Sequence, residues 1–148
     1  GGAVATLAAS KLNSMLDPRQ EVRVVTFEAP RVGDGQFSTL LNAAYAPNPG
    51  SFIRITNKGD PVVHLPPAWI YFSHNTQEVY QNYDGITYNC DPLNGEDSTC
   101  ADSNYIATDI SAHLVAWSVQ FGWPCPVGAI HYPPIAPTPN PDCKIVVS

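Results

Sequence analysis

Two residues that are far apart in the sequence have side chains suited to proton transfer. Asp60 lies shortly after the apolar segment 52–55 and stands between Gly59 and Pro61, which favour a turn. The sites of open parallel sheets lie at the carboxyl ends of strands, so this position makes Asp60 a candidate site residue. An aspartate of this kind is also typical of an ordinary turn.

His113 is the second candidate. An imidazole ring titrates near neutral pH, and its neutral form takes a proton from a hydroxyl nucleophile. The sequence predicts a helix that begins with a cap at Asp109, runs to Phe121 and ends at Gly122 and Pro124. His113 would lie near the start of this helix, where the helix dipole disfavours the charged ring. The alternative is a core histidine whose ring is satisfied by a backbone carbonyl.

The order of the two residues indicates a reaction class. In α/β-hydrolases the nucleophilic serine comes first, on a strand-to-helix turn of the form G-x-S-x-G, and the acid and then the histidine follow it. The chain opens with Gly1, Gly2 and Ala3. These small residues suit a helix start that presses against a neighbouring backbone just after such a turn. The turn itself is not among these residues, so we expect the nucleophile to lie upstream of Gly1.

The segments around the candidates alternate between helical and strand patterns. Apolar residues at three- and four-residue steps predict an amphipathic helix over 1–16. Its apolar stripe would consist of Val4, Leu7, Ala8, Leu12 and Met15. Apolar and β-branched runs predict buried parallel strands at 22–27 and 52–55, separated by a short helix with a cap at Asp34. The predicted fold class is therefore α/β, with a mostly parallel sheet and flanking helices.

The pattern changes in the second half of the chain. Segments 77–81 and 86–88 flank a turn-forming stretch and predict a β-hairpin. Residues 125–148 are rich in proline and lack a helical period, so we expect an extended tail. The predicted organisation is one domain over 1–124, followed by the tail 125–148.

The composition argues against two kinds of partner. Only 14% of the 148 residues are charged, and the formal net charge is -6. The sequence therefore lacks the basic surface that binds nucleic acid. No apolar run approaches the roughly 18 residues that cross a bilayer. We expect neither nucleic-acid binding nor a membrane-spanning segment.

The cysteines favour disulfides over metal ligation. No two of Cys90, Cys100, Cys125 and Cys143 have the two-residue spacing of zinc sites. Disulfides indicate an oxidising, secreted setting. Cys90 and Cys100 flank a polar loop and predict a local bridge, and four buried free thiols are the alternative.

The remaining histidines suggest no further chemistry. His64 follows Asp60 closely, and His74 lies in an aromatic segment, and we interpret both as structural. A metal site made of His64, His74 and His131 has no supporting spacing. We expect no metal and no cofactor.

Four segments in this order resemble the fungal class 3 lipases, a branch of the α/β-hydrolases that includes triacylglycerol lipases and feruloyl esterases. The segments are GGAVA at 1–5, TFEAPRVG at 26–33, NKGDPVVHLPP at 57–67 and DISAHL at 109–114. The resemblance extends from Gly1 to Cys125. It implies an upstream elbow Gly-His-Ser-Leu-Gly-Gly, whose serine would lie two residues before Gly1.

The resemblance also implies residue roles. Asp60 would be the acid and His113 the base of a Ser-Asp-His triad that hydrolyses carboxylic esters. The sequence departs from the family at Glu28, where glycine is usual, and such a carboxyl group beside a buried strand needs a partner or an exposed position. Cys125 resembles a family cysteine that pairs near the N-terminus of the whole protein.

The expected partners follow from this assignment. They are an ester or lipid substrate, a lipid-water interface for the complete enzyme, and the missing N-terminal half of the same secreted protein. Without the upstream strand, we expect an unpaired edge at 22–27 and an inactive isolated chain. The alternatives are a feruloyl or other soluble-ester esterase of the same family, and a non-catalytic fragment or binding module.

Overall fold

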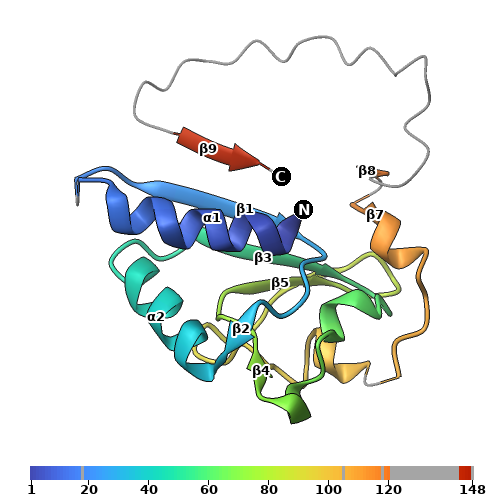
Figure 1. The fold of residues 1–148 in the computed structure, drawn as a ribbon. Coiled ribbons are helices and arrows are strands. Elements are labelled where there is room, and N and C mark those ends of the chain that lie inside the picture. The colour runs from blue at the N-terminus through green and yellow to red at the C-terminus, as the bar shows by residue number, and fades with distance from the viewer. Residues whose placement is uncertain (18, 105, 118, 121–143, 148) are drawn as a thin grey trace, which may run out of the picture.

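The fold is built on one five-stranded sheet. The computed structural model describes residues 1–17, 19–104, 106–117, 119–120 and 144–147. The strand order is β6-β5-β3-β1-β9 (Figure 1). The parallel members are β1 (Val22–Phe27), β3 (Phe52–Asn57), β5 (Glu78–Gln81) and β9 (Lys144–Val147), whereas β6 (Thr87–Asn89) runs antiparallel to β5. The α/β prediction and both predicted strands are confirmed.

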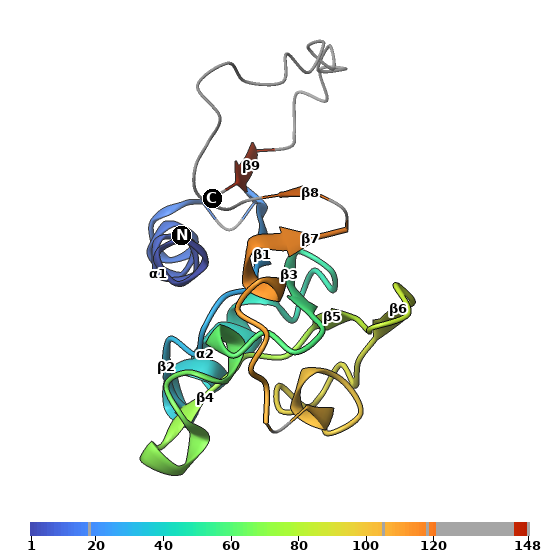
Figure 2. The ribbon, with the colours of Figure 1, turned by 90° about the vertical axis from the view of Figure 1, so that its right-hand side faces the viewer.

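Two helices cover one face of the sheet (Figure 2). They are α1 (Gly2–Met15) and α2 (Gly35–Tyr45), which begins at the predicted cap, where Asp34 Oδ1 accepts a hydrogen bond from the backbone N of Phe37 at 2.9 Å. The main core cluster consists of Ala9, Val22, Val24, Leu41, Tyr45 and Phe52. Neither helix, nor any other in the described part of the chain, has the length and apolar character needed to cross a bilayer.

The remaining elements are two short antiparallel strand pairs and several 3-10 helices. β2 (Gly33–Asp34) pairs with β4 (Phe72–Ser73), and β7 (Val115–Ala116) pairs with β8 (Val119–Gln120), both antiparallel. The short 3-10 helices are η1 (Val62–His64), η2 (Ala68–Ile70), η3 (Ala101–Ser103) and η4 (Ala112–Leu114). The predicted hairpin is confirmed as β5 and β6, with Tyr80 opposite Tyr88.

The helix α1 was predicted correctly, but most of its predicted apolar stripe does not face the sheet. Val4, Leu7 and Met15 are 70%, 52% and 68% exposed. Ala5 and Ala9, with Thr6, face the sheet instead. Small side chains let the helix lie close to the strands, so Val4, Leu7 and Met15 point away from them, whereas Leu12 of the predicted stripe packs against the core cluster.

The first turn of α1 explains this close approach. A Cβ atom on Gly2 would lie 2.7 Å from Ala29 Cβ and 3.3 Å from the carbonyl oxygen of Phe27. The prediction that the small residues press against a neighbouring backbone is therefore confirmed. The helix start meets the segment that leaves β1, at the carboxyl end of the sheet.

The predicted helix over 109–121 is wrong within the described residues. Only the short η4 forms there, and Trp117 adopts φ +49° before the chain turns into β8. The amide Nδ2 of Asn57 donates hydrogen bonds to the carbonyl oxygens of Ala112 and Val115. A continuing helix would use these oxygens as its own acceptors, so the side chain of β3 competes with helix propagation. Phe121, the last residue of the prediction, lies outside the described residues.

The expected unpaired edge of β1 is also wrong. β9 pairs with β1 in parallel, with Val22 opposite Lys144 and Val25 opposite Val147. The rest of the predicted tail, 125–143 and residue 148, lies outside the described residues, as do Cys125 and Cys143. The division into a domain over 1–124 and a tail stays a prediction.

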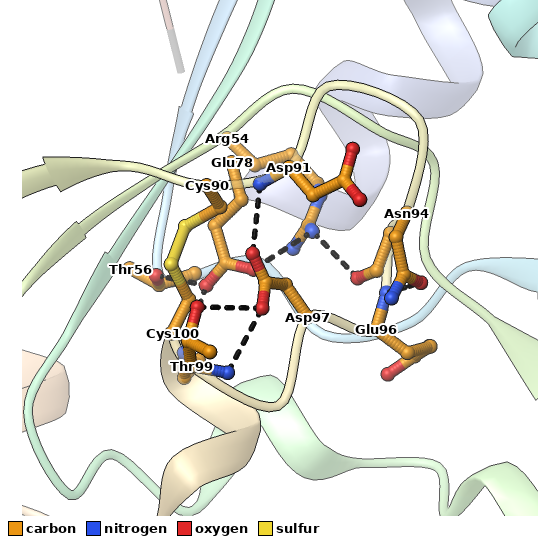
Figure 3. The surroundings of a disulfide bond; sticks show 12 residues. Arg54, Thr56, Glu78, Cys90, Asp91, Asn94, Glu96, Asp97, Thr99 and Cys100 are labelled. Atoms are coloured by element: carbon orange, nitrogen blue, oxygen red, sulfur yellow. Dashed lines mark hydrogen bonds and ion pairs between the residues drawn. A yellow bond between two sulfur atoms is a disulfide. The ribbon is translucent and has the colours of Figure 1, made fainter.

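The predicted bridge between Cys90 and Cys100 is present, and it closes a loop over buried polar groups (Figure 3). Below the loop, Arg54 pairs with Glu78 at 3.4 Å and donates to the carbonyl oxygen of Gly95 at 3.0 Å. Both charged side chains are buried. Within the loop, the side chain of Asp97 accepts hydrogen bonds from the backbone N of Asp91 and of Thr99. These bonds hold the loop backbone on both sides of Asp97.

We predict that removal of this bridge destabilises the chain. The variant Cys90→Ser/Cys100→Ser should lose about 2 to 4 kcal/mol of unfolding free energy, because the unfolded loop is no longer constrained. Denaturant unfolding with and without reductant measures this. Reductant should destabilise the original chain more than the double variant. Equal midpoints for the two chains would show that the bridge contributes nothing.

Candidate active site

Asp60 and His113 are in contact, although they are 53 positions apart in the sequence. The ring Nδ1 of His113 lies 2.9 Å from Oδ2 of Asp60, so the fold brings the two candidates together. Asp60 is fully buried, and its Oδ1 accepts a hydrogen bond from the backbone N of Val62 at 2.7 Å. A carboxylate can only accept here, so Nδ1 of His113 carries the hydrogen, and Nε2 is left to accept a proton.

A tight turn after β3 holds Asp60 in this position. Gly59 adopts φ +61°, a conformation that favours glycine. The carbonyl oxygen of Gly59 accepts from the backbone N of Asp109 at 3.0 Å, and the backbone N of Lys58 donates to Gln81 at 2.9 Å. The turn is thereby connected both to β5 and to the segment that carries His113.

His113 is held by a capped turn. Asp109 Oδ1 accepts from the backbone N of Ser111 at 3.0 Å and of Ala112 at 3.3 Å, but the N-cap residue of η4 is Ser111 and not the predicted Asp109. The turn η4 has only three residues and supplies no helix dipole of the expected kind. The ring of His113 is instead oriented by Asp60.

Two residues at the site were not assigned a role from the sequence. Asn57 ties the turn that carries His113 to the end of β3 through its side-chain amide. Glu28 follows β1 at φ +51° and is only 2% exposed, and its Oε2 accepts from the backbone N of Asn57 at 3.1 Å. Both lie at the carboxyl ends of parallel strands, which is the feature that singled out Asp60.

Burial and the nearby Asp60 carboxyl raise the pKa of Glu28 to about 10. The carboxyl of Glu28 is therefore neutral at pH 7. This answers the question that the sequence raised about a carboxyl beside a buried strand, because the group is neither exposed nor paired with a cation.

A cleft of about 510 Å³ lies between the start of α1 and His113. It is lined by Gly1, Gly2, Ala3, Phe27, Glu28, Pro30, Val62, His113 and Leu114. The small residues at the start of α1 and the imidazole therefore face the same space. This arrangement suits a reaction in which a group near the start of α1 exchanges a proton with His113.

The other described histidines are structural, as predicted. Nδ1 of His64 lies 3.3 Å from Asp102 Oδ1, outside the cleft lining. Nε2 of His74 lies 2.8 Å from the carbonyl oxygen of Val63, and burial together with the charge of Arg54 keeps the pKa of His74 well below its usual range. His131 lies outside the described residues.

The described residues contain one group of side chains close enough to share a metal ion, namely Cys90, Asp97 and Cys100. The two sulfur atoms are joined in the disulfide, so they are not available as thiolate ligands. This group therefore does not form a metal site.

We predict that Gly59→Ala disrupts the turn that carries Asp60. A Cβ atom would overlap the hydroxyl of Tyr83, so this side chain would have to leave its contact with the turn, in addition to the cost of about 1 kcal/mol for a side chain at positive φ. Gly85→Ala is the matched control, since Gly85 has φ +76° and nothing within 4 Å of the added atom. Thermal unfolding should show the larger loss for Gly59→Ala. Equal losses would contradict the close approach of Tyr83.

We also predict that Asn57→Asp releases the turn that carries His113. The substitution replaces a donor by an oxygen that faces two carbonyl oxygens, so the unfolding free energy should fall by about 1 to 3 kcal/mol. Amide hydrogen exchange around Ala112 should become faster. Asn82→Asp is the control, because the side-chain oxygen of Asn82 caps an exposed turn and an aspartate keeps this oxygen. Unchanged exchange in Asn57→Asp would refute the docking role.

Comparisons with known proteins find similarity to lipases. Residues 1–69 match the family model "Lipase (class 3)". The chain is 45% identical over 83 residues to Lipase A of Sodiomyces alcalophilus, a match that covers 50% of this chain and 20% of that protein. It is 39% identical over 87 residues to the secreted mono- and diacylglycerol lipase 2 of Gibberella zeae, with coverage of 54% and 21%. The matched part thus spans about a fifth of these relatives.

Solved lipases share the fold. Lipase II of Rhizopus niveus superposes with a TM-score of 0.69 at 26% identity, covering 82% of this chain and 45% of that chain. The triacylglyceride lipase of Rhizomucor miehei gives 0.70 at 27% identity, covering 82% and 46%. A further neighbour, at 0.69 and 26%, is a triacylglycerol lipase whose catalytic centre is a serine protease triad. The parallel sheet, the flanking helices and these similarities support the assignment of the chain as part of a fungal class 3 lipase with an α/β-hydrolase fold.

Proposed function

We propose that this chain is the C-terminal part of a carboxylic ester hydrolase, in which Asp60 is the acid and His113 the base of a Ser-Asp-His triad. The observation that carries the proposal is the 2.9 Å contact between the two side chains, with His113 facing a cleft shared with the start of α1. An imidazole oriented in this way is what a serine nucleophile requires.

In the proposed reaction, a serine upstream of Gly1 attacks the ester carbonyl while Nε2 of His113 takes its proton. The alcohol then leaves with that proton, and a water molecule hydrolyses the acyl-enzyme by the same route. Asp60 keeps the ring in the correct tautomer and stabilises its charged form. The mechanism uses no metal and no cofactor.

The proposed whole enzyme includes an upstream segment that packs against this chain. Val4, Leu7 and Met15 form an exposed apolar face on α1, which is the kind of surface that another segment covers. The same segment would supply the serine and the backbone N-H of the residue after it, which forms part of the oxyanion hole.

The proposed substrates are acylglycerol-type esters at a lipid-water interface, and the proposed location is extracellular. A relative is named as a secreted mono- and diacylglycerol lipase, and several neighbours are lipases. The Cys90–Cys100 bridge is consistent with an oxidising compartment. A soluble-ester esterase would differ in preferring short soluble esters over emulsified long-chain ones.

We predict that the 148-residue chain alone has no triad-based esterase activity and gains it when combined with its upstream segment. Loss of the nucleophile costs roughly 10⁴-fold or more in turnover, and part of the oxyanion hole is lost with it. Hydrolysis of a short-chain chromogenic ester by the chain, the upstream segment and their mixture measures this. Emulsified long-chain esters, assayed in parallel, identify the substrate class.

The matched controls are His113→Ala and His64→Ala in the mixture. His113→Ala should abolish turnover, and Asp60→Asn should reduce it by about 10⁴-fold through the wrong ring tautomer. His64→Ala should leave a folded mixture active. Robust turnover by the isolated chain, abolished by His113→Ala, would reveal a different nucleophile and refute the proposed mechanism.

A further inference from the structure

We propose that Glu28 is a positioning residue of the Asp60–His113 pair, with a carboxyl group that is protonated at neutral pH and donates a hydrogen bond to the Asp60 carboxylate. The catalytic meaning of this hydrogen bond rests on the proposed function. The protonation of Glu28 itself does not, because it follows from the structure around the two carboxyl groups.

Neighbouring strands bring the two carboxyl groups together. Glu28 leaves β1, and its backbone N donates to the carbonyl oxygen of Ile55 in β3 at 2.9 Å. Asp60 lies just beyond the end of β3. Glu28 is 2% exposed and Asp60 is 0% exposed. The two side chains lie close enough to interact directly. Two buried carboxyl groups at such a distance are not both ionised at neutral pH, so one of them holds a proton.

The hydrogen-bond donors around each group indicate which one is protonated. Both oxygens of Asp60 accept hydrogen bonds, Oδ1 from the backbone of Val62 and Oδ2 from His113. Oε2 of Glu28 accepts from the backbone N of Asn57. Oε1 of Glu28 is buried and finds no partner among the residues that the structure describes. A proton on Oε1 makes this atom a donor, and Asp60 retains lone pairs to accept it.

The surrounding charges act in the same direction. Burial and the neighbouring Asp60 raise the pKa of Glu28, and the more distant carboxyl of Glu78 adds to this effect. The backbone N-H of Asn57 opposes it. The other titratable groups that line the cleft are the amino group of Gly1 and the ring of His113, and the hydrogen bond of His113 is made to Asp60.

The backbone supports a role at the site. Glu28 adopts φ +51°, a backbone conformation that is unfavourable for a non-glycine residue. Its buried carboxyl carries a second cost. Unfavourable features of this kind cluster where a group is held in place for function. A third hydrogen bond to Asp60 would fix the carboxylate that orients the ring.

The first test measures the proton of Glu28 directly. The chain is labelled with ¹³C at the glutamate carboxyl groups and is studied alone or with its upstream segment, whichever is soluble. Glu28→Gln identifies the Glu28 signal. We expect this signal to keep its protonated position from pH 5 to pH 8 and to shift only at strongly alkaline pH. Titration with the ordinary midpoint of a glutamate, about 4.3, would overturn the proposal.

The second test separates hydrogen bonding from simple packing. Glu28→Gln keeps a donor that can reach Asp60, whereas Glu28→Leu has a similar size and no donor. The ¹⁵N and ¹H signals of the His113 ring report its Nδ1-H hydrogen bond to Asp60. We expect the hydrogen-bonded signal to be retained in Glu28→Gln and weakened in Glu28→Leu. Equal signals in the two folded variants would show that Glu28 only fills space.

The third measurement is the dependence of stability on pH. The folded chain holds a proton on Glu28 that the unfolded chain loses above pH 5, so folding becomes less favourable as the pH rises towards 10. The folding equilibrium constant should fall by up to about tenfold per pH unit relative to that of Glu28→Gln. Glu21→Gln, at the opposite end of β1, is the control and should follow the original chain. Parallel pH profiles for Glu28→Gln and the original chain would contradict a buried proton.

The tests of Glu28 protonation and the assay of ester hydrolysis can fail separately. If the mixture of the two segments fails to hydrolyse esters while the Glu28 signal stays protonated, the triad proposal fails and the hydrogen bond stands. If the mixture is active and Glu28 titrates as an ordinary glutamate, the positioning role fails and the triad stands.

Discussion

The Asp60 carboxylate is buried with no exposed surface, and a buried charge is tolerated only when hydrogen-bond donors surround it. Its donors come from the next turn of the chain, at Val62, and from the distant His113. Gly59 allows the turn that directs the side chain inwards. The turn 59–62 and the segment that carries His113 are thus brought together around one buried carboxylate.

The end of β3 organises the site because neighbouring segments bind to it through polar groups. The backbone N of Asn57 donates to Glu28, and its side chain holds the turn before His113. The carbonyl oxygen of Gly59 accepts from Asp109. The sheet therefore supplies a rigid frame, and hydrogen bonds at its carboxyl end, rather than a hydrophobic cluster, bring the loops into register.

Local patterns in the sequence predicted the strands β1 and β3, the first two helices, the hairpin and the bridge between Cys90 and Cys100, because each depends on residues close together in the chain. They did not predict β9, which pairs with β1 from the far end of the chain. The buried face of α1 was not predictable in this way, since it depends on how closely the helix approaches the sheet. The helix after Asp109 failed because a side chain from β3 takes its carbonyl acceptors. The role of Glu28 depends on its neighbour Asp60, which no local pattern reveals.

The turn that carries His113 is attached to the rest of the chain by a few hydrogen bonds to Asn57, Gly59 and Asp60. The sheet, in contrast, is held by continuous hydrogen-bond ladders and an apolar core. Segments with few buried apolar contacts open at a lower free energy than the core does. A population with an intact sheet and a detached imidazole would therefore precede global unfolding. Such molecules would keep the far-ultraviolet spectrum of the folded chain while lacking the contact between acid and base.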